Sequence, residues 1–217
     1  MKAAFTVMRR ELSSNRISFI VTAAVVLCAT TSGDSEIALS NGNYTWLLAV
    51  LSPFFFVFYD CAKLMHLGAD KRDYCAGSLM AYGALALLVS AVNSVFCYAV
   101  DPLNKAQTVV NMIGLCGWTK NGAAAAFLQQ ALFLFLVMVF LHALLLAQSY
   151  WYGWLADGLL AAVICVFTPI EPLRRVLAGF FGIIMFNSSA LPHIAVCAAL
   201  SAAFAAAGIA VLKRKTL

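Results

Sequence analysis

The stretch from residue 123 to residue 147 contains no aspartate, glutamate, lysine or arginine. A run of about 20 apolar residues is enough for a helix to cross the hydrocarbon core of a bilayer. Similar runs recur along the chain, so that 64% of the 217 residues are hydrophobic and only 11% are charged. A soluble domain is about half apolar and about a quarter charged, and it could not bury so much apolar surface. The sequence therefore predicts an integral membrane protein, and its spans are helices because the alternation typical of a transmembrane barrel is absent.

The order of apolar and polar segments predicts an all-α membrane protein in which residues 1–217 form a single transmembrane domain. Six stretches are expected to cross the membrane: residues 17–32, 44–62, 75–100, 123–147, 158–168 and 193–212. The fifth stretch is short for a span unless the aromatic cluster before it belongs to the same helix. Pro53 lies inside the second stretch and is expected to kink it.

Two further apolar pieces, residues 109–118 and 176–186, are too short to cross a bilayer as helices. They are compatible with broken helices that line a transport path, and equally with helices that cover the outer face of the spans. Residues 171–189 as a whole are expected to form outer surface or re-entrant helices between the fifth and sixth spans.

Lysine and arginine are distributed unequally between the two sides of these spans. Ten of the 14 basic residues fall on one side, and they are Lys2, Arg9, Arg10, Arg16, Lys63, Lys71, Arg72, Lys213, Arg214 and Lys215. The other four are Lys105, Lys120, Arg174 and Arg175. Because basic residues are retained on the cytoplasmic side, both termini are expected in the cytoplasm, with the chain in the plasma membrane.

Residues 1–16 are predicted to form a helix in the membrane interface. Phe5, Met8 and Leu12 recur at spacings of three and four, with basic residues around them. This pattern is typical of an amphipathic helix that lies along the bilayer surface.

The sequence lacks the common catalytic and metal-binding motifs. GxxxxGK[ST], HExxH and GxSxG are absent, and none of the seven cysteines forms a CxxC pair. These patterns mark nucleotide, zinc and nucleophile sites. The lone intramembrane His142 is interpreted as a packed residue bonded to a neighbouring helix, with a proton relay as the alternative. We therefore expect no catalytic residue, no metal ligand and no cofactor bound by this chain.

The predicted spans carry almost no charge, whereas ion-coupled transporters usually bury charged groups. Asp60 and Asp157 fall at predicted cytoplasmic ends of spans and are interpreted as solvated. Asp60 is placed to pair with Lys63, one helical turn further along.

The polar segment of residues 63–74, KLMHLGADKRDY, lies on the predicted cytoplasmic side between the second and third spans. It is short, rich in charge and continuous with a predicted helix on each side. Such a segment, as a loop or as a short polar helix, is suited to docking on a soluble ATPase. An ordinary positively charged cytoplasmic loop is the alternative interpretation.

Together these segments resemble the permease subunit of an ATP-binding-cassette exporter of the type II six-span kind. In that family an amphipathic elbow helix precedes the first span, and the basic patch Met8, Arg9, Arg10 and Glu11 is similar to it. Small bacterial peptide or lantibiotic export and immunity permeases carry a glycine and a small residue before an arginine and an aromatic residue, and residues 68–74 are similar. Residues 146–159 resemble the junction of the fourth and fifth spans. The segment of residues 101–122 is longer than the family pattern.

The resemblance implies a bacterial dimer of two permease subunits with two ATP-binding-cassette ATPase subunits below it. ATP and magnesium would be bound by the ATPase partner, and no nucleic acid is expected. The implied coupling residues, which would dock on the ATPase, are Leu67, Gly68, Ala69, Asp70, Lys71, Arg72, Asp73 and Tyr74. The implied elbow residues are Met8, Arg9, Arg10 and Glu11.

The substrate is constrained only by the apolar character of the spans, which favours a peptide, a lipid or a hydrophobic compound over a small ion. Two other classes stay open at this point. One is an ATP-independent secondary transporter or channel, and the other is a membrane enzyme or a scaffold that transports nothing.

Overall fold

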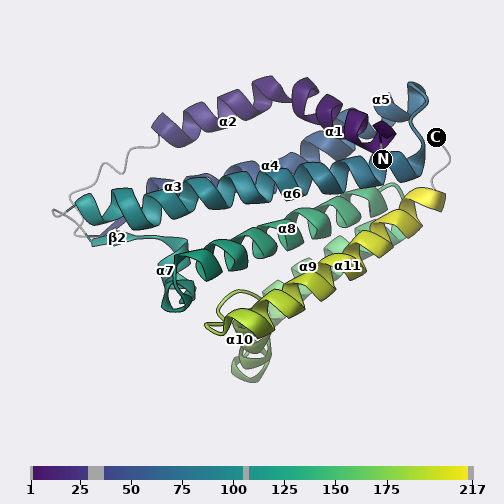
Figure 1. The fold of residues 1–217 in the computed structure, drawn as a ribbon. Coiled ribbons are helices and arrows are strands. Elements are labelled where there is room, and N and C mark those ends of the chain that lie inside the picture. Colours follow the sequence, from purple (N-terminus) through teal and green to yellow (C-terminus); the bar gives the residue numbers. More distant parts are fainter. Residues whose placement is uncertain (1, 29–36, 105–107, 215–217) are drawn as a thin grey trace.

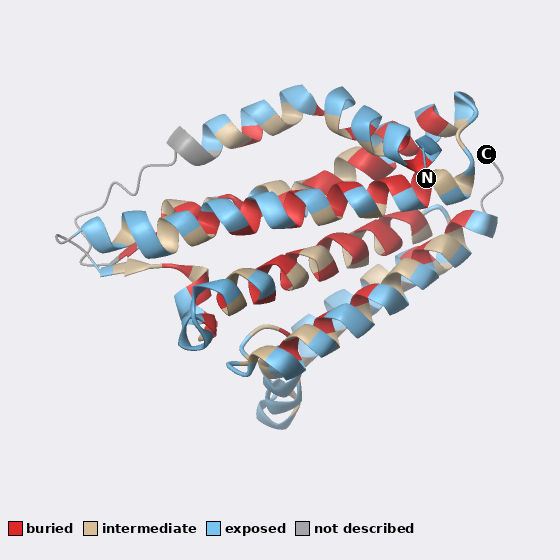
Figure 2. Cartoon of the chain, viewed as in Figure 1, coloured by how far each residue is buried: buried red, intermediate tan, exposed pale blue. Residues whose placement is uncertain are grey.

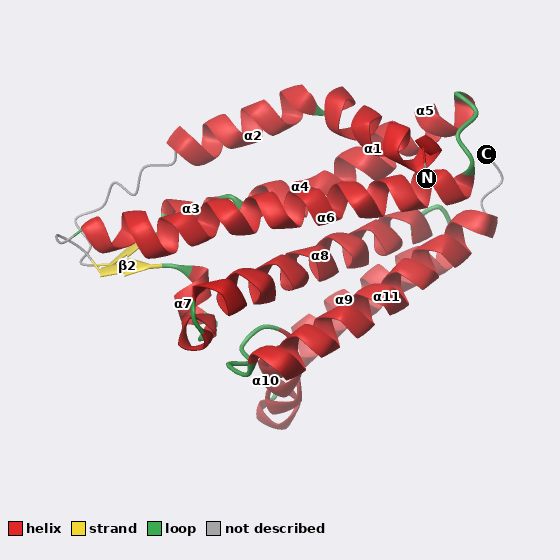
Figure 3. Cartoon of the chain, viewed as in Figure 1, coloured by secondary structure: helices red, strands yellow, loops and turns green. Residues whose placement is uncertain are grey.

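The computed structural model describes residues 2–28, 37–104 and 108–214, and this part of the chain is mainly helical (Figures 1 and 3). Its α-helices are α1 (Lys2–Ser14), α2 (Arg16–Cys28), α3 (Asn41–Tyr44), α4 (Trp46–Phe54), α5 (Cys61–His66), α6 (Lys71–Val95), α7 (Met112–Leu115), α8 (Ala123–Ala147), α9 (Trp151–Phe167), α10 (Glu171–Ile184) and α11 (Ala190–Arg214). The π-helical segments are η1 (Phe55–Asp60) and η2 (Phe96–Val100), and the 3-10 segments are η3 (Asp101–Leu103) and η4 (Trp118–Asn121). The strands are β1 (Ile37–Leu39) and β2 (Thr108–Val110).

Four helical stretches in the described residues are long and apolar enough to cross a membrane. They are Asn41–His66, Lys71–Leu103, Ala123–Ala147 and Ala190–Arg214. They cover the second, third, fourth and sixth of the spans that the sequence predicts. A helical membrane protein is therefore supported, with four or five candidate spans.

The fifth candidate is the pair α9 and α10, between which the chain bends by 120°. α9 begins at Trp151, so the aromatic cluster belongs to the helix and extends it beyond the expected residues 158–168. α10 begins at Glu171, earlier than the expected piece at residues 176–186, with Pro172 in its first turn. Proline suits that position because the first turn of a helix needs no backbone donor.

The expected first span, residues 17–32, begins in α2, and its residues 29–32 lie outside the described part of the chain. The apolar part of α2, Arg16–Val25, is shorter than the four long stretches. α1 and α2 form an arch over the remaining helices (Figure 1).

The core lies between α4, α6, α8 and α11. Buried residues concentrate along α6 and α8, whereas α9 and α10 are exposed over most of their surface (Figure 2). Tyr82 on α6 stacks on Phe56 with ring centroids 5.3 Å apart. The Tyr82 hydroxyl lies 2.8 Å from Nδ1 of His142 on α8. The interpretation of His142 as a packed residue that bonds a neighbouring helix is thus confirmed.

Pro53 does not break the helix that contains it. Because proline has no N–H, the carbonyl oxygen of Ala49 would lack its usual donor, and the Ser52 hydroxyl donates to it at 3.1 Å instead. The π-helical segment η1 follows, in which the N–H of Cys61 reaches back five residues to the Phe56 carbonyl oxygen. The Tyr74 hydroxyl donates to the same oxygen at 3.1 Å.

We call the end of the bundle that carries β1 and β2 the β end, and the opposite end, with α1 and residues 67–70, the α1 end. At the β end the two strands pair in parallel, which the sequence did not indicate. Residues 109–118, expected as one short helix, instead divide between β2, α7 and η4. The Asn111 side chain explains the break, because it caps α7 by accepting from the Ile113 N–H at 3.0 Å.

Asn111 also holds the β end together. Its Nδ2 atom lies 3.0 Å from both Ser40 Oγ and Asn93 Oδ1, and 3.1 Å from Asp101 Oδ2. The Ser40 hydroxyl donates to the other carboxylate oxygen of Asp101 at 2.9 Å. This network connects the N-caps of α3 and α7 with α6 and η3 through side chains far apart in the sequence.

Candidate functional site

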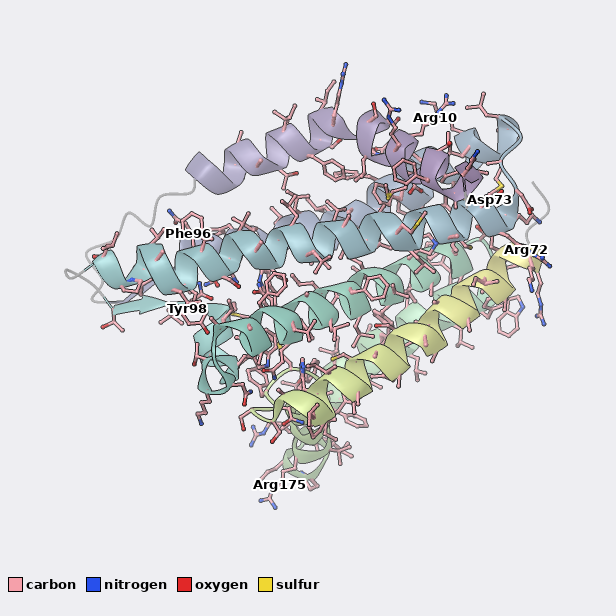
Figure 4. The ribbon with its side chains drawn as sticks, in the orientation of Figure 1. Arg10, Arg72, Asp73, Phe96, Tyr98 and Arg175 are labelled. Atoms are coloured by element: carbon pink, nitrogen blue, oxygen red, sulfur yellow. The ribbon has the colours of Figure 1, made fainter. Side chains whose placement is uncertain are left out.

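The two segments singled out in the sequence, residues 8–11 and 67–74, lie at the same end of the molecule. Figure 4 shows Arg10, Arg72 and Asp73 at the α1 end, opposite Phe96 and Tyr98. A groove of about 370 Å³ runs between α1 and the turn that joins α5 to α6. Its lining residues are Ala3, Thr6, Val7, Arg10, Leu64, Leu67, Gly68, Ala69, Asp70 and Asp73.

The turn of residues 67–70 has a defined backbone geometry. The N–H of Gly68 donates to the Met65 carbonyl at 3.0 Å, and the N–H of Ala69 donates to the Leu64 carbonyl at 3.0 Å. This pair of bonds is a Schellman motif, which closes a helix through a residue in the left-handed region. Gly68 has φ +85° and fills that position without steric cost. The turn is therefore held in one conformation by its own backbone.

No separate short helix lies between α5 and α6. Residues 63–66 complete α5, and residues 71–74 form the first turn of α6, so only residues 67–70 lie outside helices. Of the two forms expected for the segment, loop or short helix, the structure has a four-residue turn. A force on this turn would act directly on both long helices.

The implied coupling residues divide into accessible and inaccessible ones. Leu67, Gly68, Asp70 and Arg72 are exposed, and Ala69, Lys71 and Asp73 are half-buried. Tyr74 is fully buried and stacks on His142, so it cannot contact a soluble partner. Its part is to bond α6 to the π-helical segment through the Phe56 carbonyl.

The implied elbow residues divide in the same way. Arg9 and Arg10 are exposed, Met8 packs against the main core, and Glu11 is fully buried. The Ser78 hydroxyl of α6 donates to Glu11 Oε1 at 2.6 Å, whereas Oε2 has no partner in the described residues. The pKa of the Glu11 carboxyl is raised to about 8, mainly by burial; the Ser78 bond acts to lower it, and the nearby Asp60 acts to raise it.

α1 packs on α6 at unusually short range. A Cβ atom at Gly77 would lie 2.7 Å from Val7 Cγ1 and 2.8 Å from the Ala4 carbonyl oxygen. A small residue here lets two helix backbones approach closely. At the end of α1, the Asn15 amide donates to Oδ2 of Asp60 and, at 2.9 Å, to the Glu11 carbonyl. Asn15 and Ser14 are hydrogen-bonded to Asp60, whereas Lys63 acts on it through its charge.

A second hollow adjoins the groove at the α1 end. Its volume is about 410 Å³, and its lining residues are Thr6, Arg9, Arg10, Ser13, Ser14 and Lys63. The sequence indicated the basic residues of α1, but not that Lys63 from α5 would complete a hollow with them.

The described residues contain no group of three or more metal-ligating side chains. The three histidines lie on separate elements, α5, α8 and α11. What the described geometry offers at the α1 end is a surface for binding, formed by a rigid turn and a helix fixed to the bundle.

No protein-family model, curated protein or solved structure matches this chain. Its sequence pattern and the geometry of the α1 end are therefore what bears on its function.

Sequence reasoning did not find Gly77, Ser78 and Asn15, which fix α1 to the bundle. A usable signal exists for two of them, because Gly77 and Ser78 are adjacent small residues near the start of an otherwise apolar helix. Small residues in a membrane helix favour close packing, although they do not identify the partner helix.

Proposed function

We propose that this chain is the membrane-spanning permease subunit of an ATP-driven ABC transporter, with ATP hydrolysis supplied by a separate ATPase subunit. The groove between α1 and the 67–70 turn is the observation that carries the proposal. It brings the two segments that resemble an elbow and a coupling element into one surface. In this proposal six spans cross the plasma membrane, both termini are cytoplasmic, and a second permease subunit completes the path.

The charges along the groove suit a protein partner. Arg10 lies on its α1 side, and Asp70 and Asp73 lie on its turn side. Leu67 is 58% exposed between them and offers an apolar contact. A partner loop with an apolar residue and charges of both signs would complement this surface.

The packing at the α1 end supplies a route for motion. A displacement of the 67–70 turn would move α5 and α6 together, because the turn is continuous with both. α1 would follow α6, since Gly77 and the bond from Ser78 to Glu11 fix it there. In this mechanism ATP-driven closure of the partner moves three helices as one body and opens the path on the other side. A peptide, a lipid or a hydrophobic compound is the proposed substrate.

The experiment is purification of the tagged full-length chain from its host in mild detergent, with identification and quantification of the co-purified proteins. An ABC-type ATPase in stoichiometric amount is expected, with ATPase activity that depends on this chain. The Arg72→Glu variant should lose at least about tenfold in ATPase recovery, because it reverses an exposed charge among the implied coupling residues. Arg174→Glu, an exposed residue of α10, is the matched control and should retain the ATPase.

Equal ATPase recovery with Arg72→Glu and Arg174→Glu would contradict docking through the implied coupling residues 67–74. Absence of any ATPase from the wild-type preparation would contradict the transporter class itself.

One observation favours a second candidate, an ATP-independent secondary transporter. The bundle interior contains neutral polar side chains, and neither amide atom of the buried Gln130 has a partner among the described residues. Ser90 on α6 is likewise buried without a partner among these residues. Transporters without buried charge use such neutral groups along the path. Substrate uptake into vesicles driven by an ion gradient in the absence of ATP would identify this class.

A further inference from the structure

We propose that the hollow lined by Arg9, Arg10 and Lys63 binds the phosphate of an anionic phospholipid headgroup. Its six lining side chains are three cations and three hydroxyls, and no carboxylate lines it. Arginine and lysine bind phosphate through charge-assisted hydrogen bonds. The Ser13 hydroxyl can add a neutral donor, whereas the Thr6 hydroxyl donates to the Lys2 carbonyl and Ser14 is bonded to Asp60. The chemistry of the hollow is thus that of a phosphate site.

None of the three cations forms an ion pair within 4.0 Å with an acid in the described residues. Within residues 2–28, 37–104 and 108–214, the ion pair closer than 4.0 Å is that of Arg175 with Glu171, at the other end of the molecule. Asp60 is near enough to attract Arg10 and Lys63 electrostatically, but it is 3% exposed and its Oδ2 atom is occupied by Asn15. Asp60 therefore offsets part of the positive charge of the hollow. Because it forms no ion pair with these cations within 4.0 Å, they can still bind an anion from the solvent.

Two elements form the hollow together. Thr6, Arg9 and Ser13 recur at spacings of three and four, so they lie along one face of α1. Lys63 joins them from α5, since Asn15 and Asp60 connect the end of α1 to the start of α5. A hollow built from two fixed elements keeps its cations together without a ligand, which lowers the ordering cost of binding.

Exposed apolar residues beside the hollow favour a lipid over a free phosphate ion. Phe5 is 57% exposed on α1, and Ile17 and Ile20 are 69% and 65% exposed at the start of α2. A lipid whose phosphate occupies the hollow could lay its acyl chains along this apolar surface. Basic clusters next to membrane helices attract anionic lipid.

The test uses the full-length chain in detergent, titrated with phosphatidylglycerol or phosphatidylcholine, with bound lipid counted by native mass spectrometry. Phosphatidylglycerol should bind at least about tenfold more tightly than phosphatidylcholine. The double variant Arg9→Gln, Lys63→Gln should reduce this preference at least about tenfold, because two cations are removed. The control Lys213→Gln, Arg214→Gln removes equal charge from the end of α11 and should leave the preference unchanged.

Arg10 is kept in these variants because it also lines the groove proposed for the ATPase. Equal phosphatidylglycerol binding by wild type and the Arg9, Lys63 variant would overturn the proposal. Displacement of the lipid by millimolar inorganic phosphate would also overturn it, by identifying a free ion as the ligand. If the double variant does not fold, the wild type in 0.5 M salt and the Lys63→Arg variant at low salt replace it. The wild type should lose its preference for phosphatidylglycerol in high salt, and Lys63→Arg, which keeps the charge, should retain it. Loss of the preference in Lys63→Arg at low salt would overturn the proposal.

Discussion

The Ser78 hydroxyl donates to Oε1 of Glu11 at 2.6 Å, joining two helices at a point where the glutamate is fully buried. Removing a carboxylate from water is costly, so burial is far more favourable for the protonated acid. α1 is therefore held on α6 by a group whose charge depends on pH, and this relationship leads to the first prediction.

Stability should fall as pH rises through the neutral range. The pKa of Glu11 is about 8 in the folded protein and near 4.5 in the unfolded chain, so between these values the folded state binds the additional proton. The free energy of unfolding therefore decreases with rising pH over this window, by at most about 5 kcal/mol at about 1.4 kcal/mol per pKa unit. Thermal denaturation in detergent from pH 5 to pH 9 measures it.

Glu11→Gln should remove most of this pH dependence, because the amide stays neutral throughout. Glu171→Gln on the exposed start of α10 is the control and should keep the wild-type slope. A slope that persists unchanged in Glu11→Gln would show that Glu11 is not its source.

Gly77→Ala should detach α1 from α6. The added methyl group would meet Val7 and the Ala4 backbone at less than 3.0 Å, so α1 must move or lose contact. A destabilisation of about 1–3 kcal/mol is expected from such overpacking. Faster proteolysis within α1, followed by mass spectrometry, reports detachment. Gly83→Ala on the same helix meets no atom within 4 Å and should be neutral or slightly stabilising.

Gly68→Ala should loosen the 67–70 turn. An alanine at φ +85° costs about 1 kcal/mol because its Cβ crowds the following carbonyl. Asparagine tolerates this conformation better, so Gly68→Asn should lose less stability than Gly68→Ala. The two melting temperatures, compared with wild type, test the order. An unchanged melting temperature in Gly68→Ala would contradict the described turn.

Asn111→Ala should weaken the β end. The substitution leaves the buried oxygens of Ser40 and Asn93 without their shared donor, at a cost of about 1–3 kcal/mol. Asn111→Asp should be worse at neutral pH, because it places a second carboxylate beside Asp101. Hydrogen exchange of α7 amides measures the loss locally. Equal protection in all three proteins would contradict a structural role for the network.

The positions of the long apolar spans could be predicted from the sequence. Which side of each span packs against other helices could not. The stretch of residues 123–147 coincides with α8 because charge-free apolar residues define both. In a membrane helix the side facing lipid and the side facing protein are both apolar, so periodicity gives no information on packing. Thus the close contact at Gly77 was found only in the structure.

The candidate site shows the same division. Arg9, Arg10 and residues 67–74 were found from charge and turn residues, because polar groups stand out in an apolar chain. The burial of Glu11 and Tyr74 was not, since a polar residue near a helix end usually contacts water. The strand pair at the β end also lacked a signal, as each strand has only three residues.

The π-helical winding of Phe55–Asp60 determines which sides α5 presents. A π-turn accommodates one residue more than an α-turn, and one residue corresponds to about 100° around a helix. Regular α-helical winding of the same residues would rotate everything after Asp60, turning Leu64 out of the core and Lys63 away from α1. A chain shorter by one residue within this segment would restore both orientations. A single-residue deletion here is therefore structurally compatible with an intact α1 end.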